Sequence, residues 1–177
     1  MSINIDLRSV LSVFMLGSCA FANTVCQKTP GTLVCHHGET EVINTSGIFR
    51  AEGTSIKKKV SVKGQAIIRA GKINDMKIIG GLVLEDSSVL GQVVIHGFLN
   101  SRGSTFHKTM TIYGANLQAE STKFEDVIVD GSEKIARVSL QDKTIVNGNI
   151  IFKGSPGVVM LGSQSKILGK IINGKQA

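Results

Sequence analysis

The stretch STFHKTMTIYG (104–114) is followed 17 residues later by a near copy, STKFEDVIVDG (121–131). Each copy starts with a pair of hydroxyl residues, contains one phenylalanine, and ends with alternating apolar residues and a glycine. A period of 17 residues is too long for a coiled-coil heptad and too short for a helical-hairpin repeat. The chain therefore contains a repeat built on another kind of unit.

The short unit apolar-x-apolar-x-glycine occurs throughout the chain, as VSVKG, MKIIG, VVIHG, MTIYG and VIVDG. It ends at Gly64, Gly80, Gly97, Gly114 and Gly131. The same step predicts Gly148 as the next equivalent glycine, before the rhythm loosens in IIFKG and KIING. Two further apolar positions precede each glycine, so one unit holds three short alternating segments. Alternation with period two indicates strands with one buried face.

The composition supports an all-β fold, because Gly is abundant at 20, Pro is rare at 2, and Trp is absent. We expect a single-stranded, right-handed parallel β-helix of about seven coils over residues 47–177, in which each coil pairs with its copies above and below. An antiparallel β-sandwich is the main alternative, but sandwiches do not keep one period through five consecutive units.

The segment SKILGKIING (165–174) resembles the repeat of the bactofilins. As an architecture, the resemblance extends over residues 47–174. It implies a right-handed β-helix of similar coil length, and bactofilins polymerise end to end. The resemblance therefore predicts self-association through the ends of the rod.

Residues 1–22 are predicted to be a signal peptide. Arg8 precedes the short apolar run VLSVFMLG (10–17), and Ala20-Phe21-Ala22 fits a signal-peptidase site. The segment around Cys19 also matches a lipobox, which makes this cysteine a candidate for lipidation and for anchoring in the outer membrane. Both interpretations predict export to the periplasm, outer membrane or cell surface of a Gram-negative bacterium.

Cys26 and Cys35 remain as an even pair in an oxidising compartment. A hairpin that turns at Pro30-Gly31 places the two cysteines opposite each other, with Cα atoms about 4.5 Å apart. We expect a disulfide in an N-terminal cap at residues 23–46. Metal binding by Cys35-His36-His37 is the alternative, although no second ligand cluster exists in the sequence.

The formal net charge is +7, and residues 47–77 hold eight basic residues against two acidic ones. The candidate binding residues in this segment are Arg50, Lys57, Lys58, Lys59 and Lys63. In an exported protein such a cluster favours an anionic envelope partner, such as lipid head groups, lipopolysaccharide, peptidoglycan or an acidic protein surface, over nucleic acid. A solvated charge run is the competing interpretation.

The residues just before the corner glycines are expected to form one outward-facing column. They are Lys63, Ile79, His96, Tyr113, Asp130 and Asn147. His96, Tyr113 and Asp130 would then lie on adjacent coils and form a small binding patch with side chains capable of acid–base chemistry. An ordinary solvent-facing column is the alternative.

The sequence contains no recognisable catalytic motif, and we expect neither an enzyme, nor a cofactor, nor a metal site. The predicted function is a structural or scaffold role in the cell envelope, in which the rod docks to another component, such as a secretion or surface assembly. A carbohydrate-binding or polysaccharide-modifying protein that uses the His96, Tyr113 and Asp130 column is the alternative function.

Overall fold

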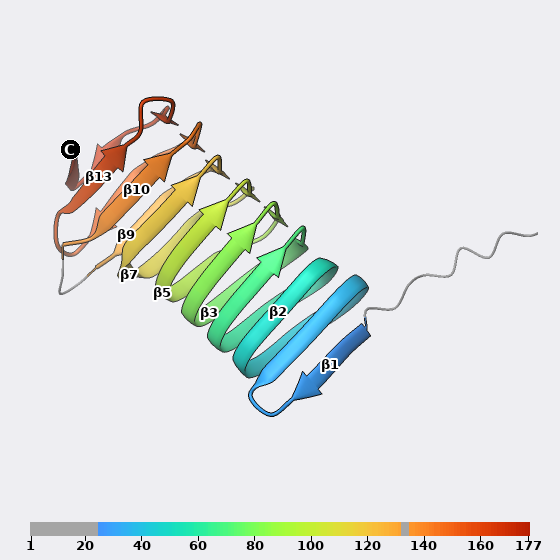
Figure 1. Ribbon diagram of the computed structural model, residues 1–177. Helices are drawn as coiled ribbons and strands as arrows, with labels where there is room; N and C mark the ends of the chain where they lie inside the picture. Colours follow the sequence, from blue (N-terminus) through green and yellow to red (C-terminus); the bar gives the residue numbers. More distant parts are fainter. Residues whose placement is uncertain (1–24, 132–134) are drawn as a thin grey trace, which may run out of the picture.

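The computed structural model describes residues 25–131 and 135–177. In this part of the chain, parallel strands stack into a rod-shaped β-solenoid of about 7 turns, which confirms the predicted fold class (Figure 1). The described residues form strands, turns and connecting segments without a helix, and thus offer no helix able to cross a membrane. The predicted signal peptide and Cys19 lie outside the described residues.

Strand length varies widely along the chain, from 2 to 38 residues. The strands are β1 (Val25–Thr29), β2 (Thr32–Arg69), β3 (Lys72–Glu85), β4 (Ser88–Val89), β5 (Val93–Arg102), β6 (Thr105–Phe106), β7 (Met110–Glu120), β8 (Lys123–Phe124), β9 (Val127–Asp130), β10 (Arg137–Gln141), β11 (Ile145–Val146), β12 (Ile150–Lys153), β13 (Gly157–Leu161), β14 (Lys166–Ile167), β15 (Ile171–Ile172) and β16 (Gly174–Gln176). The longest strands bend around corners and contribute to more than one side of the rod.

The rod has three faces, each a parallel ladder. Face A contains residues 60–63, 76–79, 93–96 and 110–113, followed by β9, β12 and β15. Face B contains residues 65–69, 81–85, 98–102 and 116–120, followed by β10, β13 and β16. Face C contains residues 55–56 and 72–73, followed by β4, β6, β8, β11 and β14.

The core lies between the three faces, because every second residue of a strand points inward. Ile78, Ile95 and Ile112 are successive partners on face A, and each is fully buried. Phe106 and Phe124 stack in the same way on face C, with ring centroids 4.8 Å apart. The repeated apolar residues of the two copies 104–114 and 121–131 are therefore vertical neighbours in one core.

The corner between faces A and B is built from glycines that stack directly on one another. Gly64, Gly80 and Gly97 have φ of +136°, +134° and +146°, a region that other residues rarely adopt. A Cβ on any of them would collide with the backbone carbonyl of the glycine one coil earlier. The glycine column begins before residue 47, at Gly31, because a Cβ on Gly47 would collide with Gly31 O. Ile48 N–H donates to the same carbonyl at 2.8 Å. Accordingly, β2 runs unbroken across the expected boundary between residues 46 and 47.

Buried hydroxyl groups connect the coils at the corner between faces B and C. Ser87 N–H donates to Ser104 Oγ, at 3.1 Å, and Ser104 Oγ donates to Arg102 O, at 2.9 Å. Thr122 and Thr144 repeat the arrangement in later coils. The hydroxyl groups of Ser104 and Thr144 thus each satisfy one backbone group of their own coil and one of the preceding coil, whereas Thr122 Oγ1 lies 3.2 Å from the Ser101 hydroxyl of the preceding coil. These hydrogen bonds stabilise a corner that has no regular strand pairing.

The expectation that Gly148 continues the glycine column is wrong. Asp130 pairs with Lys153, and Gly148 N–H donates to Glu125 O at the corner between faces C and A. The coils lengthen here, since equivalent corner residues are 17 apart at Ser87 and Ser104 but 22 apart at Thr122 and Thr144. The motif TIVNG instead contains the face C strand β11 and the corner that follows it. Alternating apolar residues followed by a glycine fit this corner between faces C and A as well as the corner between faces A and B.

Candidate functional site

The predicted column on face A exists over most of its length. Lys63, Ile79, His96, Tyr113 and Asp130 are successive partners in parallel register. Asn147 does not belong to the column: Lys153 takes its place, and Asn147 lies beside Glu125, to which its side-chain amide donates a hydrogen bond at 2.9 Å. Asn147 is displaced from the column for the same reason as Gly148: the coil after Asp130 is longer than 17 residues.

His96 and Tyr113 stack on each other, with ring centroids 4.6 Å apart and ring planes 11° from parallel. Because this stacking runs along the rod, the flat side of each ring points toward a neighbouring coil and the ring edges point to solvent. A sugar packs against an aromatic residue through the flat face of its ring. In Tyr113, one face of the ring is covered by His96 and the other is turned toward the coil of Asp130. The geometry thus brings the three residues together but favours a structural stack over a sugar-binding platform.

The predicted basic residues surround the rod and do not form a single patch. Arg50 lines a depression with Ile67 and Arg69 on face B, whereas Lys63 lies on face A. Lys57, Lys58 and Lys59 follow the face C segment 55–56, at the corner that leads to face A. These residues therefore point in several directions, and together they give the first coils a basic belt.

Two lysines of this belt form ion pairs with the preceding coil. Lys57 pairs with Glu39, and Lys58 Nζ donates to Glu41 Oε2 at 2.7 Å. The hydrogen bond from Lys58 and the positive charge of the same side chain lower the pKa of the Glu41 carboxyl below its ordinary value. The repeat period could have revealed these pairs, since Glu41 and Lys58 are 17 residues apart.

The predicted disulfide joins Cys26 to Cys35 and closes the hairpin of β1 and β2. The two residues are direct partners in the antiparallel register, with Cα atoms 4.1 Å apart. Because the Cys35 sulfur is bonded to Cys26, the Cys35-His36-His37 metal alternative loses its thiolate ligand, and the described residues contain no cluster of three or more metal-ligating side chains. The disulfide indicates a non-cytoplasmic, oxidising environment.

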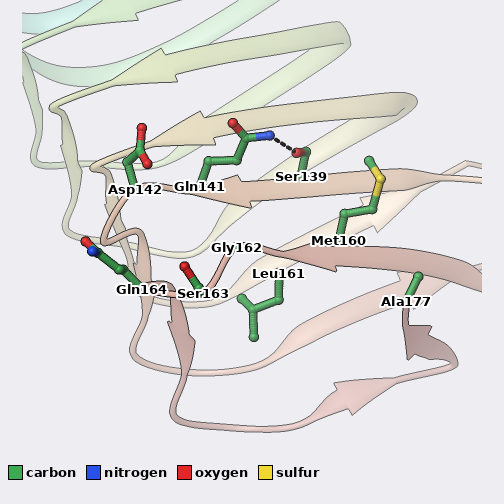
Figure 2. Close-up of a pocket in the computed structure, with 9 residues that line it drawn as sticks. All are labelled: Ser139, Gln141, Asp142, Met160, Leu161, Gly162, Ser163, Gln164 and Ala177. Carbon is green, nitrogen blue, oxygen red and sulfur yellow. Dashed lines mark hydrogen bonds between the residues drawn. The ribbon is translucent and has the colours of Figure 1, made fainter.

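A surface that the sequence did not single out lies on face B, over the second half of the rod. Two adjoining depressions of about 390 and 470 Å³ meet at Ser139 and Met160. Carboxamide side chains line them, namely Asn100, Asn116, Gln118, Gln141 and Gln164. Figure 2 shows the second depression, in which Gln141 Nε2 donates to Ser139 Oγ at 3.3 Å. The sequence could have revealed this surface through the carboxamide residues at the outward positions of face B, but these positions align only once the true coil lengths are known.

The two ends of the rod differ. At the N-terminal end, β1 pairs with the first residues of β2 and is held there by the Cys26–Cys35 disulfide, while its outer edge has no partner among the described residues. At the C-terminal end, β14, β15 and β16 each pair with one strand, of the preceding coil, and their other edges are unpaired within the described chain. Leu168 and Ile172 are 67% and 43% exposed in this last coil. Such an edge can accept a further strand.

Comparison with known protein families, with curated proteins and with solved structures finds no significant match to this chain. The resemblance to bactofilins stays a prediction for this reason.

Proposed function

We propose that this protein is an exported, non-enzymatic scaffold of the cell envelope that docks a partner protein at its C-terminal end. The observation that carries the proposal is the exposure of the last coil: its strand edges are unpaired within the described chain, and Leu168 and Ile172 are exposed beside them. At the N-terminal end, by contrast, the disulfide fixes the terminal hairpin covalently. A rod of paired strands keeps these ends a fixed distance apart, as a spacer or scaffold requires.

The charge of the last coils favours a particular kind of partner. Residues 135–177 contain six basic residues and one acidic residue. Lys166 and Lys170 flank the exposed Leu168, and Lys175 lies in the terminal strand β16. We infer a partner that adds a β-strand to the open edge and surrounds it with acidic side chains. The belt that contains Lys59 and Lys63 would help to orient the rod toward an anionic envelope surface.

The disulfide supports an oxidising compartment, and the proposed export refines this to the envelope. The intact mass of the mature protein tests this part directly. A chain that begins at Asn23 and is two hydrogens lighter than its reduced form would fit a soluble exported protein, whereas an acyl adduct on Cys19 would fit an anchored one. A full-length chain with its first residue retained would contradict export.

Photo-crosslinking in the native cell tests the docking. A photoreactive amino acid at position 168 is expected to crosslink to an envelope protein, while the same group at Leu90, an exposed position on the side of the rod, is not. Equal crosslinking from both positions, or none from position 168, would contradict a docking end. Crosslinking of position 168 to a second copy of this chain would instead establish end-to-end self-association.

A further inference from the structure

The two adjoining depressions form a groove on face B, and the lengths of the side chains along it explain its shape. Gln118, Ser139 and Met160 are successive partners in the central outward column, on β7, β10 and β13. Ser139 is much shorter than either neighbour, so the surface dips at its position, where the two depressions meet. The groove runs across the strands, along the axis of the rod. From β5 to β16 it crosses four coil steps, or about 19 Å at the usual strand spacing.

The polar lining of the groove is rich in carboxamides. Asn100, Asn116 and Gln118 are exposed in the first depression, and Gln141 and Gln164 are exposed in the second. Each carboxamide offers two N–H donors and a carbonyl acceptor on one planar group. A ligand that matches this lining must itself donate and accept hydrogen bonds at closely spaced positions, as a sugar hydroxyl does.

The groove is nearly neutral, in contrast to the basic last coils. Its ionisable lining consists of one cation, Arg137, and one anion, Asp142. A phosphate-rich or metal-bound ligand requires a cluster of like charges, which this lining does not provide. The lining therefore favours a neutral ligand.

Two exposed apolar side chains give the groove surfaces that suit the C–H faces of a sugar. Phe98 lies at one end and is 46% exposed, with its ring over the backbone of Gly81, where a Cβ would collide with it. Met160 is 45% exposed and lies where the depressions meet. A peptide strand is a poorer fit, because β10 is already paired on both sides and offers no backbone edge.

We propose that this groove binds a neutral oligosaccharide chain that lies along the rod axis over face B. The carboxamides bind its hydroxyl groups, and Phe98 and Met160 contact its sugar rings. The proposal does not depend on the proposed docking end, although the groove reaches the last coil at Ala177. The glycan would bind to a surface that spans several coils, and the rigid rod holds those coils in register.

The proposal is tested with purified full-length protein in native gels that contain a soluble polysaccharide. The gels contain dextran, hydroxyethyl cellulose, galactomannan or, as an anionic control, alginate. Because the pI is about 9.5, the protein migrates toward the cathode at neutral pH. We expect at least one neutral polysaccharide to retard it. The Asn116→Ala/Gln118→Ala variant should bind that polysaccharide at least about tenfold more weakly, since it loses several hydrogen bonds.

The matched control is Gln27→Ala/Asn44→Ala, which removes two exposed carboxamides near the N-terminal end of the rod and should bind like the wild type. An unchanged melting temperature establishes that the Asn116→Ala/Gln118→Ala variant is folded, and Phe98→Ala provides a second groove variant, for which we also expect weaker binding. Three results would overturn the proposal: no retardation by any neutral polysaccharide, equal retardation of the groove variants and the wild type, or retardation by alginate alone.

Discussion

The coils up to Gly114 and the coils after Asp130 form one continuous rod but are specified differently. In the first half, stacked glycines leave no room for a Cβ, and the coils keep a step of 16 or 17 residues. In the second half, most steps grow to between 21 and 23 residues, although the partners in β13 and β16 are again 17 apart, and the glycine column is replaced by longer connections. The same three ladders continue through both halves.

The longer coils are where the sequence of the rod can vary most. A coil that is interlocked at its corner has a fixed length and a flat surface, whereas a longer coil can place different side chains at its outward positions. The open end lies in the second half, whereas the carboxamide groove begins on β5 and β7 and continues into the longer coils. We infer that the regular half builds the rod and that the groove forms where the two halves join.

The largest expected difference between the halves concerns their glycines. Gly97→Ala should lower the free energy of unfolding by at least about 4 kcal/mol, because the new Cβ meets a backbone carbonyl and φ is +146°. Gly148→Ala should cost about 1–2 kcal/mol, because its Cβ meets mainly the side chain of Asp126. Urea denaturation measures both values. A larger loss for Gly148→Ala would contradict the assigned register.

The disulfide is the next largest contribution, and it belongs to the first half alone. The Cys26→Ala/Cys35→Ala variant should lose about 2–3 kcal/mol, the value expected for a closed loop of this length. Hydrogen exchange should place the loss in β1 and the start of β2. Increased exchange that is largest in β13 to β16 would contradict the role of the disulfide as a local cap.

The buried hydroxyls provide a smaller comparison. Ser104→Ala should cost about 1–3 kcal/mol, because Ser87 N–H and Arg102 O each lose a partner in a buried corner. Ser165 occupies the corresponding corner of the last coil, but its Oγ is buried without a partner in the described chain. Ser165→Ala should therefore leave the free energy of unfolding unchanged or raise it slightly. Thermal melting of both variants distinguishes them, and equal losses would contradict this comparison.

The smallest expected effect concerns the ion pair of Glu41 and Lys58. The Lys58→Ala variant should return the pKa of the Glu41 carboxyl toward its ordinary value, which an NMR titration of the carboxyl carbon measures. A lowered carboxyl pKa stabilises the folded state at every pH above the ordinary pKa of the group, and this stabilisation is lost as the pH falls through the lowered pKa. Identical titration curves in the two proteins would contradict the pairing between coils.

Features that repeat locally could be predicted from the sequence. The alternation and the glycine step identified the solenoid, and the symmetry about Pro30-Gly31 identified the pairing of Cys26 with Cys35. The position of Gly148 could not be predicted, since alternation followed by glycine fits two different corners. For the same reason Asn147 was assigned to a column that Lys153 occupies.

The candidate site was harder to predict than the fold. His96, Tyr113 and Asp130 attracted attention because they are distinctive residue types, and the structure aligns them as expected. Ser139 carries no such signal, because its importance comes from being short between two longer neighbours one coil away on either side. That relation depends on coil lengths of 21 and more residues, which the regular 17-residue period conceals.

Residue-resolved hydrogen exchange of the intact protein tests the central claim most directly, that the rod is interlocked in its regular half and open at its C-terminal end. We expect amides of residues 76–79 and 93–96 to exchange only through global unfolding, since they are paired on both sides. Amides in β14, β15 and β16 that face the unpaired edge should exchange rapidly. Uniform protection along the whole rod, with β14 to β16 as slow as the central coils, would contradict an open end.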